Sequence, residues 1–91
     1  MRLDERITGP SGFVDAITTR WFGTRVCNAH SFEPGMRIEV WSRKLEKKLG
    51  AVTVKRVVRD RFGHETGEIV FNEPLPHGTR RGSLLVHIDS E

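Results

Sequence analysis

Cross-linking cysteines and long hydrophobic runs are both absent from this sequence. The one cysteine, Cys27, excludes an internal disulfide and favours a reducing compartment, and free cysteines are commonly buried, so we favour a structural position for it. No apolar run approaches the roughly 20 residues that a membrane-spanning helix needs. The segment 1–10 carries acidic residues and lacks an apolar core, unlike a signal peptide. We therefore expect a soluble protein that is made in the cytoplasm, is not exported and binds no membrane.

Catalytic and metal-binding motifs are lacking as well. The sequence has no Gly-x-Ser-x-Gly, P-loop or dinucleotide-binding pattern. None of its four histidines forms a close pair with another histidine or with the cysteine, as common zinc sites require. The carboxylates near His64 belong to a glycine-containing hairpin loop, where charged side chains mainly serve solubility. We therefore expect a protein that is not an enzyme and that uses no metal or cofactor.

Length and composition favour one small globular domain. A chain of 91 residues has room for a single core of modest size. Hydrophobic residues make up 36% of the chain and charged residues 30%, spread along it, which is typical of a folded domain. So small an apolar fraction favours a module that gains stability from neighbouring subunits. The net charge of +3 permits attraction to nucleic acid, although many unrelated proteins share it.

Short alternating segments between turn-forming residues predict an all-β fold. The clearest strand begins at Met36, and Met36, Ile38 and Val40 are expected to face the core. Other inward positions are expected at Val52, Val54, Ile69 and Phe71. We predict a small single-domain antiparallel β-barrel of SH3-like or Greek-key size, with five or six strands and at most one short helical turn. It spans residues 13–91 and follows an N-terminal arm, residues 1–12.

Turns and irregularities are also predicted from particular residues. Pro34 presets φ at the first central position of a turn and Gly35 accepts positive φ at the second, so a type II turn is expected. The apolar phase slips between Val54 and Val57, which indicates a β-bulge or a sharp bend.

Three further segments complete the predicted barrel. The charged segment 42–49 is predicted to be a hairpin loop rather than a docked helix, because it has one apolar pair. The proline-containing segment 73–78 is predicted to cross between strands. In the last strand the expected inward residues are Leu84, Val86 and Ile88, and His87 is expected to point outward.

Two aromatic residues and the N-terminal arm are the candidate contacts with a protein partner. Trp41 falls opposite the inward set, so it is either packed in a second layer or exposed in a contact patch. Phe62, at the tip of a predicted loop, has the same two interpretations, because an exposed aromatic at a tip often marks a contact surface. Leu3 and Ile7 of the arm share one helical face and are the remaining candidates for packing on a neighbour.

Basic residues form three clusters, and the first two are candidates for binding nucleic acid. If these two clusters are adjacent in a hairpin, they form one positive rim that can follow phosphates, although acidic residues interrupt it and a solvated face is the alternative. Trp21, Phe22 or Trp41 on the same face would supply base stacking. The candidate residues are Arg43, Lys44, Lys47, Lys48, Arg56, Arg59 and Arg61. The third cluster is Arg80 and Arg81.

Several strand and turn residues occur in a recognisable order. They are Phe32-x-Pro34-Gly35-Met36-x-Ile38-x-Val40, then Ala51-Val52-Thr53-Val54-x-x-Val57, then Gly67-x-Ile69-Val70-Phe71, then Leu75-Pro76-x-Gly78-x-x-x-Gly82. This order covers about two thirds of the chain and resembles a recurrent β-module of tailed-bacteriophage virion proteins, including inserted domains of major capsid proteins. Ser83 departs from the pattern, which usually has aspartate there. The resemblance implies a small barrel that is a structural component of a phage-like particle.

A similar segment occurs in the accessory barrel of parallel β-helix glycosidases related to alpha-1,3-galactosidases. The catalytic carboxylates of those enzymes belong to the β-helix, which this chain lacks, so no catalytic residue is carried over. Three functions therefore stay open. We favour a non-enzymatic assembly module, a virion component that binds itself or a larger scaffold protein. The alternatives are a nucleic-acid-binding barrel and a carbohydrate-associated accessory barrel.

Overall fold

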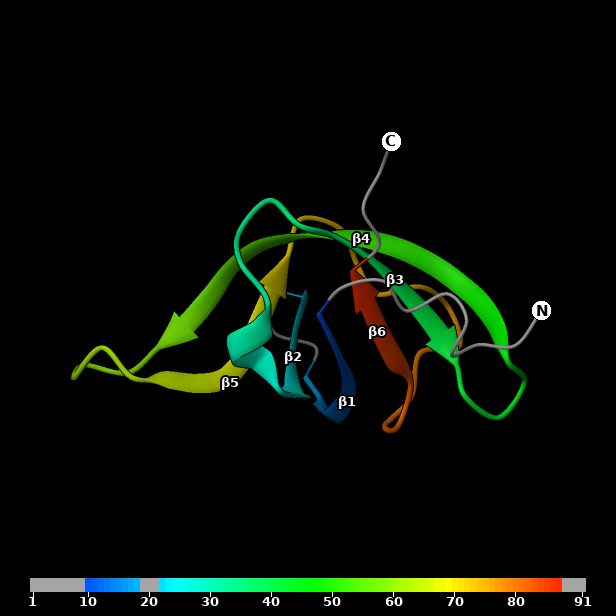
Figure 1. Ribbon diagram of the computed structural model, residues 1–91, viewed down its shortest axis with the longest axis horizontal. Helices are drawn as coiled ribbons and strands as arrows, with labels where there is room; N and C mark the ends of the chain where they lie inside the picture. Colours follow the sequence, from blue (N-terminus) through cyan, green and yellow to red (C-terminus); the bar gives the residue numbers. More distant parts are fainter. Residues whose placement is uncertain (1–9, 19–21, 88–91) are drawn as a thin grey trace.

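Six antiparallel strands form a closed barrel in the computed structural model, which describes residues 10–18 and 22–87. The strands are β1 (Ser11–Ile17), β2 (Gly23–Cys27), β3 (Arg37–Ser42), β4 (Lys47–Arg59), β5 (Glu65–Phe71) and β6 (Leu84–His87). They follow the order β1-β2-β5-β4-β3-β6, and β6 closes the sheet against β1 (Figure 1). A short 3-10 turn, η3 (Ala29–Ser31), precedes β3. The predicted fold class is confirmed.

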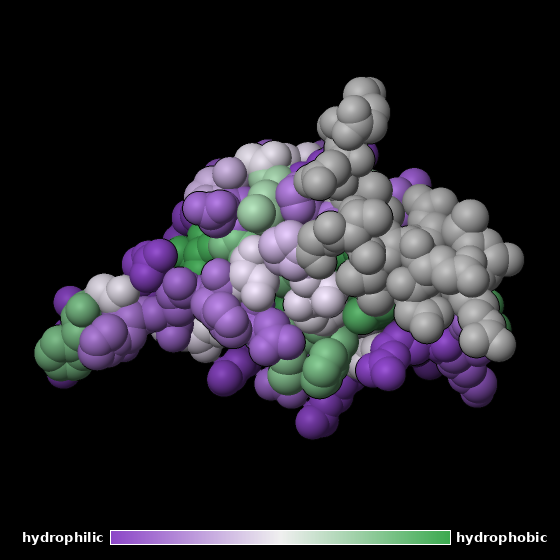
Figure 2. Space-filling model, in the orientation of Figure 1, coloured by the Kyte–Doolittle hydropathy of each residue, from purple (hydrophilic) through white to green (hydrophobic). Residues whose placement is uncertain are grey.

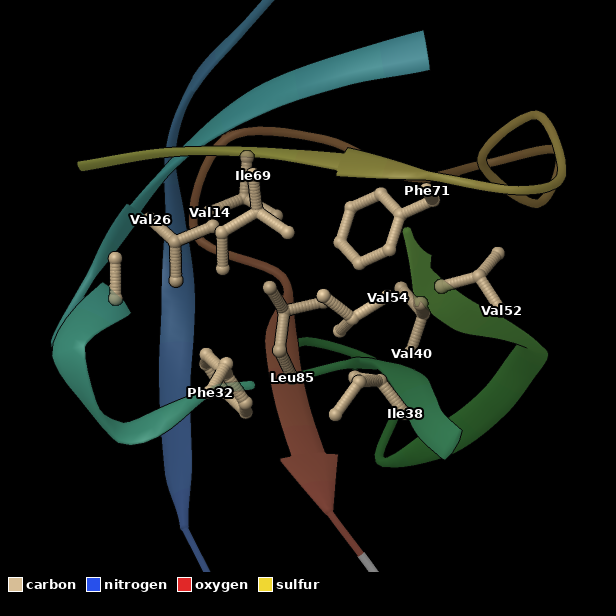
Figure 3. Packing of buried hydrophobic residues seen from close by; sticks show 11 residues of the cluster. Val14, Val26, Phe32, Ile38, Val40, Val52, Val54, Ile69, Phe71 and Leu85 are labelled. Carbon is tan, nitrogen blue, oxygen red and sulfur yellow. The ribbon is translucent and has the colours of Figure 1, made fainter. Parts of the chain in front are cut away.

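The barrel is filled by apolar side chains that alternate along the strands. Ile38 and Val40 of β3 have no exposed surface, and Met36 packs against the same cluster. Figure 3 shows that side chains from all six strands point toward one another, with the Phe71 ring beside Val40 and Val54. The inward positions predicted for β4 and β5 are confirmed: Val52, Val54, Ile69 and Phe71 all belong to this core.

The predicted turn and bulge are both present. The Met36 N–H donates to the Glu33 carbonyl at 3.2 Å, and Gly35 has φ +93°, as the second central position of a type II turn requires. The pairing of β4 with β5 shifts register between Val54 and Arg56. A bulge bends the strand that carries it, which lets one long strand serve both the barrel wall and a hairpin beyond it.

The charged segment 42–49 forms a hairpin and not a helix, as predicted, but its turn is shorter than expected, because Ser42 ends β3 and Lys47 begins β4. Residues 43–46 connect β3 to β4, and the Leu45 N–H donates to the Ser42 hydroxyl at 3.1 Å. The proline-containing segment 73–78 lies between β5 and β6 outside any strand, which also agrees with the prediction.

The facing of β6 differs from the prediction. Leu85 belongs to the core cluster, whereas Leu84 is only partly buried. Val86 has no exposed surface, but it lies on the opposite face from Leu85. His87 lies on the same inner face as Leu85, instead of pointing outward. The third residue expected inward, Ile88, lies outside the described residues. The physical reason is that residues 84–86 are all apolar, so the sequence has no alternation there that sets the phase of the strand.

The thiol of Cys27 is half-buried, where the sequence favours a buried position. Cys27 follows the inward-facing Val26 in β2 and pairs with Phe13, whose ring is 36% exposed on the outer face. Because successive side chains of a strand point to opposite faces, Cys27 is directed away from the core.

A buried hydroxyl connects β2 to the irregular part of β1. Thr24 has no exposed surface, and its Oγ1 donates to the Ala16 carbonyl at 2.8 Å, beside the register shift between Val14 and Ala16. Thr24→Val keeps the side-chain shape but removes this donor, so we expect the free energy of unfolding to fall by about 1 kcal/mol. Urea unfolding followed by tryptophan fluorescence measures the change. Equal stability of the variant and the native chain would show that this hydrogen bond contributes nothing.

Candidate functional site

The β4–β5 hairpin carries the most exposed large hydrophobic side chain of the described residues. β4 continues beyond the barrel as far as Arg59, and the chain returns as β5 from Glu65 (Figure 1). Residues 60–64 form the tip, and Phe62 within it is 71% exposed. Figure 2 shows hydrophobic surface at this outer end of the hairpin, bordered by hydrophilic side chains. The interpretation of Phe62 as an exposed tip residue therefore holds.

Hydrogen bonds hold the tip in one conformation. The Asp60 carboxylate accepts from the backbone N–H of Phe62 at 2.8 Å and of His64 at 2.9 Å. The Gly63 N–H donates to the Asp60 carbonyl at 3.0 Å, and Gly63 itself has φ +84°. Arg59 donates to the Gly63 carbonyl at 3.2 Å from the strand below. Phe62 is therefore displayed on a preformed loop rather than on a flexible one.

The Phe62 ring has one cationic neighbour, Arg61, and one aromatic neighbour, His64. The guanidinium carbon of Arg61 lies 5.2 Å from the ring centroid, within the range of a cation–π contact. The imidazole of His64 lies 6.5 Å away between centroids, tilted by 36°. These contacts limit the rotation of the ring while most of its surface still faces solvent.

Trp41 is packed and not displayed. Only 8% of its surface is exposed, and its indole N–H donates to Glu39 Oε1 at 3.0 Å. Its side chain is on the outer face of the sheet, opposite Leu84 of β6. Of the two interpretations that the sequence leaves open for this residue, the structure favours packing in a second layer. Leu3 and Ile7, the candidates in the arm, lie outside the described residues.

The two basic clusters expected to form one rim lie at opposite ends of β4. Arg43, Lys44, Lys47 and Lys48 belong to the β3–β4 turn and its edges, whereas Arg59 and Arg61 belong to the β4–β5 tip. The 13 residues of β4 separate the two ends by roughly 40 Å along the strand. Arg56 lies between them, exposed on β4. The single rim is therefore not formed, because one long strand, rather than a hairpin, connects the clusters.

Two of the candidate cations are engaged in ion pairs. Lys48 Nζ lies 3.1 Å from Glu39 Oε2, and Arg59 Nη2 lies 3.6 Å from Glu65 Oε2. Such pairs are partly exposed and contribute little to stability, but they lower the positive charge available to a ligand.

Arg80 and Arg81 lie beside the β3–β4 turn, a neighbourhood that sequence reasoning missed. They line the same groove as Arg43 and Lys44, although more than 30 residues separate the two pairs in the chain. The sequence shows Arg80 and Arg81 as a third cluster, but nothing in it indicates which of the other two they join. The closure of β6 between β3 and β1 brings them together.

Histidines and carboxylates are dispersed over the described part of the chain. No group of three or more His, Cys, Asp or Glu side chains among residues 10–18 and 22–87 is placed to hold a metal ion. Asp60 and His64 lie 4.0 Å apart at the hairpin tip, where the His64 side chain is 80% exposed. Within the same ranges, no helix has the length and apolar character needed to cross a bilayer.

Comparisons with family models, with curated proteins and with solved structures find no match for this chain.

Proposed function

We propose that this protein is a non-enzymatic structural module that binds other protein subunits through the tip of the β4–β5 hairpin. The observation that carries the proposal is the Phe62 side chain, 71% exposed on a loop held by five hydrogen bonds within residues 59–64. Isolated exposed hydrophobic residues are common, but a large aromatic fixed at the end of a projecting hairpin is a typical anchor for a partner's pocket.

The preformed tip favours binding for an energetic reason. A flexible loop loses conformational freedom when a partner orders it, and that loss opposes association. Here Asp60 and Gly63 already fix the backbone around Phe62, so little ordering remains. Aromatic residues of this kind bury a large area with few rotatable bonds, which makes them frequent hot spots of interfaces.

The larger assembly is inferred from the sequence motif. The turn and strand order from Phe32 to Gly82 resembles a β-module of tailed-bacteriophage virion proteins, and such modules act as parts of particles. We infer that the chain is a small component of a phage-like particle, and that its partner is a further copy of itself or a larger scaffold protein.

Light scattering over a range of protein concentrations tests the proposal first. We expect a mass above that of a monomer that persists from low to high salt, because an apolar contact resists screening. Phe62→Ser should weaken the association at least ~10-fold, as is usual for the loss of an aromatic hot spot. Leu45→Ser is the matched control, since Leu45 is 62% exposed at the tip of the other long hairpin and should leave the association unchanged.

If the partner is a larger scaffold protein rather than a further copy of this chain, light scattering of the isolated protein cannot detect it, and a second measurement is needed. Immobilised native protein and immobilised Phe62→Ser are compared for the proteins that they retain from the lysate of a producing cell. A native chain that is monomeric and retains nothing beyond what the variant retains would overturn the proposal, and so would an association that Phe62→Ser leaves intact.

A further inference from the structure

A basic groove lies at the other end of β4 from Phe62. It has a volume of about 560 Å³ and runs between the β3–β4 turn and the loop that leads into β6. The turn contributes Arg43 and Lys44, and the loop contributes Arg80 and Arg81. All four side chains belong to residues that are exposed to solvent.

Among residues 10–18 and 22–87, no carboxylate forms an ion pair with these four cations. The ion pairs between described residues involve other cations, and none of the groove-lining residues is acidic. Glu46, the carboxylate of the same turn, does not line the groove. Like charges brought together repel one another, and an anion in the groove removes that repulsion. The groove is therefore a surface to which negative charge is complementary.

Hydrogen bonds fix both walls of the groove. On the loop side, the Ser83 N–H donates to the Arg80 carbonyl at 2.9 Å, and the Arg80 N–H donates to the Ser83 hydroxyl at 3.0 Å. The same loop is attached to β1, because Val14 exchanges hydrogen bonds of 2.8 Å with Ser83 and Gly82. On the turn side, the Ser42 hydroxyl accepts from Leu45. The four cations thus project from two anchored segments.

We propose that this groove binds the phosphate backbone of single-stranded nucleic acid. A strand carries a negative charge on every nucleotide, so it presents several phosphates to four neighbouring cations, whereas a peptide does so only with consecutive acidic residues. The guanidinium groups of Arg80 and Arg81 suit phosphate oxygens, with which arginine forms paired hydrogen bonds. The site is independent of the proposed assembly function, because it uses none of the residues at the hairpin tip.

The shape of the groove favours a single strand over a duplex. A concave, positively charged groove is the form in which proteins usually follow one strand, whereas a duplex of much larger width contacts only the edges of so small a hollow. Leu45 and Leu49 add apolar surface to the lining, which can contact sugars and bases without reading their sequence. We therefore expect binding with little sequence preference.

Fluorescence anisotropy with a labelled 15-nucleotide oligothymidylate tests the proposal. Four phosphate contacts on a single strand predict that affinity falls about 50-fold between 50 and 200 mM salt. The double variant Arg80→Glu/Arg81→Glu removes two of these contacts, so the slope of log affinity against log salt should fall by about half, and affinity at 50 mM should fall at least ~10-fold. Circular dichroism verifies that the fold is kept.

A variant with the same change in net charge is the matched control. Arg25→Glu/Lys55→Glu reverses two exposed cations, one on β2 and one on β4, neither of which lines the groove. It should leave the salt slope unchanged. An equal loss of slope in this control would overturn the proposal, and so would a native chain that does not bind the oligonucleotide at 50 mM salt.

The acidic-protein alternative is decided in the same experiment. Labelled poly-glutamate of equal charge is titrated in parallel with the oligonucleotide. Weaker binding of poly-glutamate supports the nucleic-acid assignment. Tighter binding of poly-glutamate that the Arg80→Glu/Arg81→Glu variant abolishes would overturn it and assign the groove to an acidic protein segment.

Discussion

Phe71→Ala is expected to lower the free energy of unfolding by about 4 kcal/mol, the usual range for truncating a buried phenylalanine. Phe71 is 1% exposed and is the largest of the fully buried side chains. Its ring lies in the core beside Val54 of β4 and Val40 of β3 (Figure 3). Strands that are closed into a ring by hydrogen bonds cannot collapse far into the space that the ring would leave, so the cavity persists.

The magnitude is large compared with the total stability of a small domain. Native proteins are stable by roughly 5 to 15 kcal/mol, and a chain of 91 residues belongs to the lower part of that range. We therefore expect Phe71→Ala to be substantially unfolded at physiological temperature. Urea or thermal unfolding followed by circular dichroism measures the difference from the native chain.

Phe62→Ala is the control for this prediction, because it removes the same atoms from a side chain that is 71% exposed. It should change the free energy of unfolding by less than about 0.5 kcal/mol, as surface substitutions usually do. Comparable losses in the two variants would contradict the assignment of Phe71 to the core and of Phe62 to the surface.

Gly12→Ala is expected to destabilise the barrel by about 3 kcal/mol, the upper part of the range for overpacked sites. Gly12 is buried in β1 and pairs with Leu85 of β6, at the position where the barrel closes. A Cβ at this position would lie well inside van der Waals contact of the Cys27 carbonyl oxygen and 3.2 Å from Val26 Cγ1. The carbonyl belongs to the backbone of β2, so it cannot move unless the strand moves with it.

Ser11→Ala is the control for the effect of glycine replacement. It introduces an alanine at the neighbouring position of β1, where the side chain points to the opposite face of the strand. We therefore expect the free energy of unfolding to change by less than about 0.5 kcal/mol. Thermal unfolding of both variants measures the difference. A Gly12→Ala variant as stable as the native chain would mean that β1 can move away from β2 without loss, contrary to the geometry of the closed barrel.

Much of the barrel was predictable because local rules decide it. The strict alternation of Met36, Ile38 and Val40 sets the facing of β3, and proline followed by glycine determines the turn before it. The slip after Val54 gives the position of the bulge in β4. Each of these features depends on residues that are close together in the chain.

The facing of β6 and the burial of Trp41 were not predictable in this way. Residues 84–86 are apolar at every position, so only pairing with β3 and β1 selects Leu85 for the core. The side chain of Trp41 lies on the outer face, where alternation predicts solvent, yet it is 8% exposed. Burial on the outer face of a sheet depends on what packs against it, and the period of a strand carries no information about that.

The candidate sites show the same contrast between what local sequence determines and what tertiary contacts determine. The sequence predicts that Phe62 lies at a glycine-containing tip but leaves open whether it is packed or exposed, and the structure shows that it is exposed. The partners of the basic residues do not follow from the sequence, because β4 is long enough to separate Lys47 from Arg59, and Arg80 joins Arg43 from a distant part of the chain.

The sequence by itself determined the all-β class, the size of the barrel, the turns and most of the inward positions, because alternation and turn chemistry act over a few residues. Tertiary structure alone decided the strand order β1-β2-β5-β4-β3-β6, the phase of β6, the burial of Trp41 and the meeting of two distant basic pairs in one groove. These features depend on which strands become neighbours when the sheet closes. That choice is made by the packing of the whole core and not by any one segment.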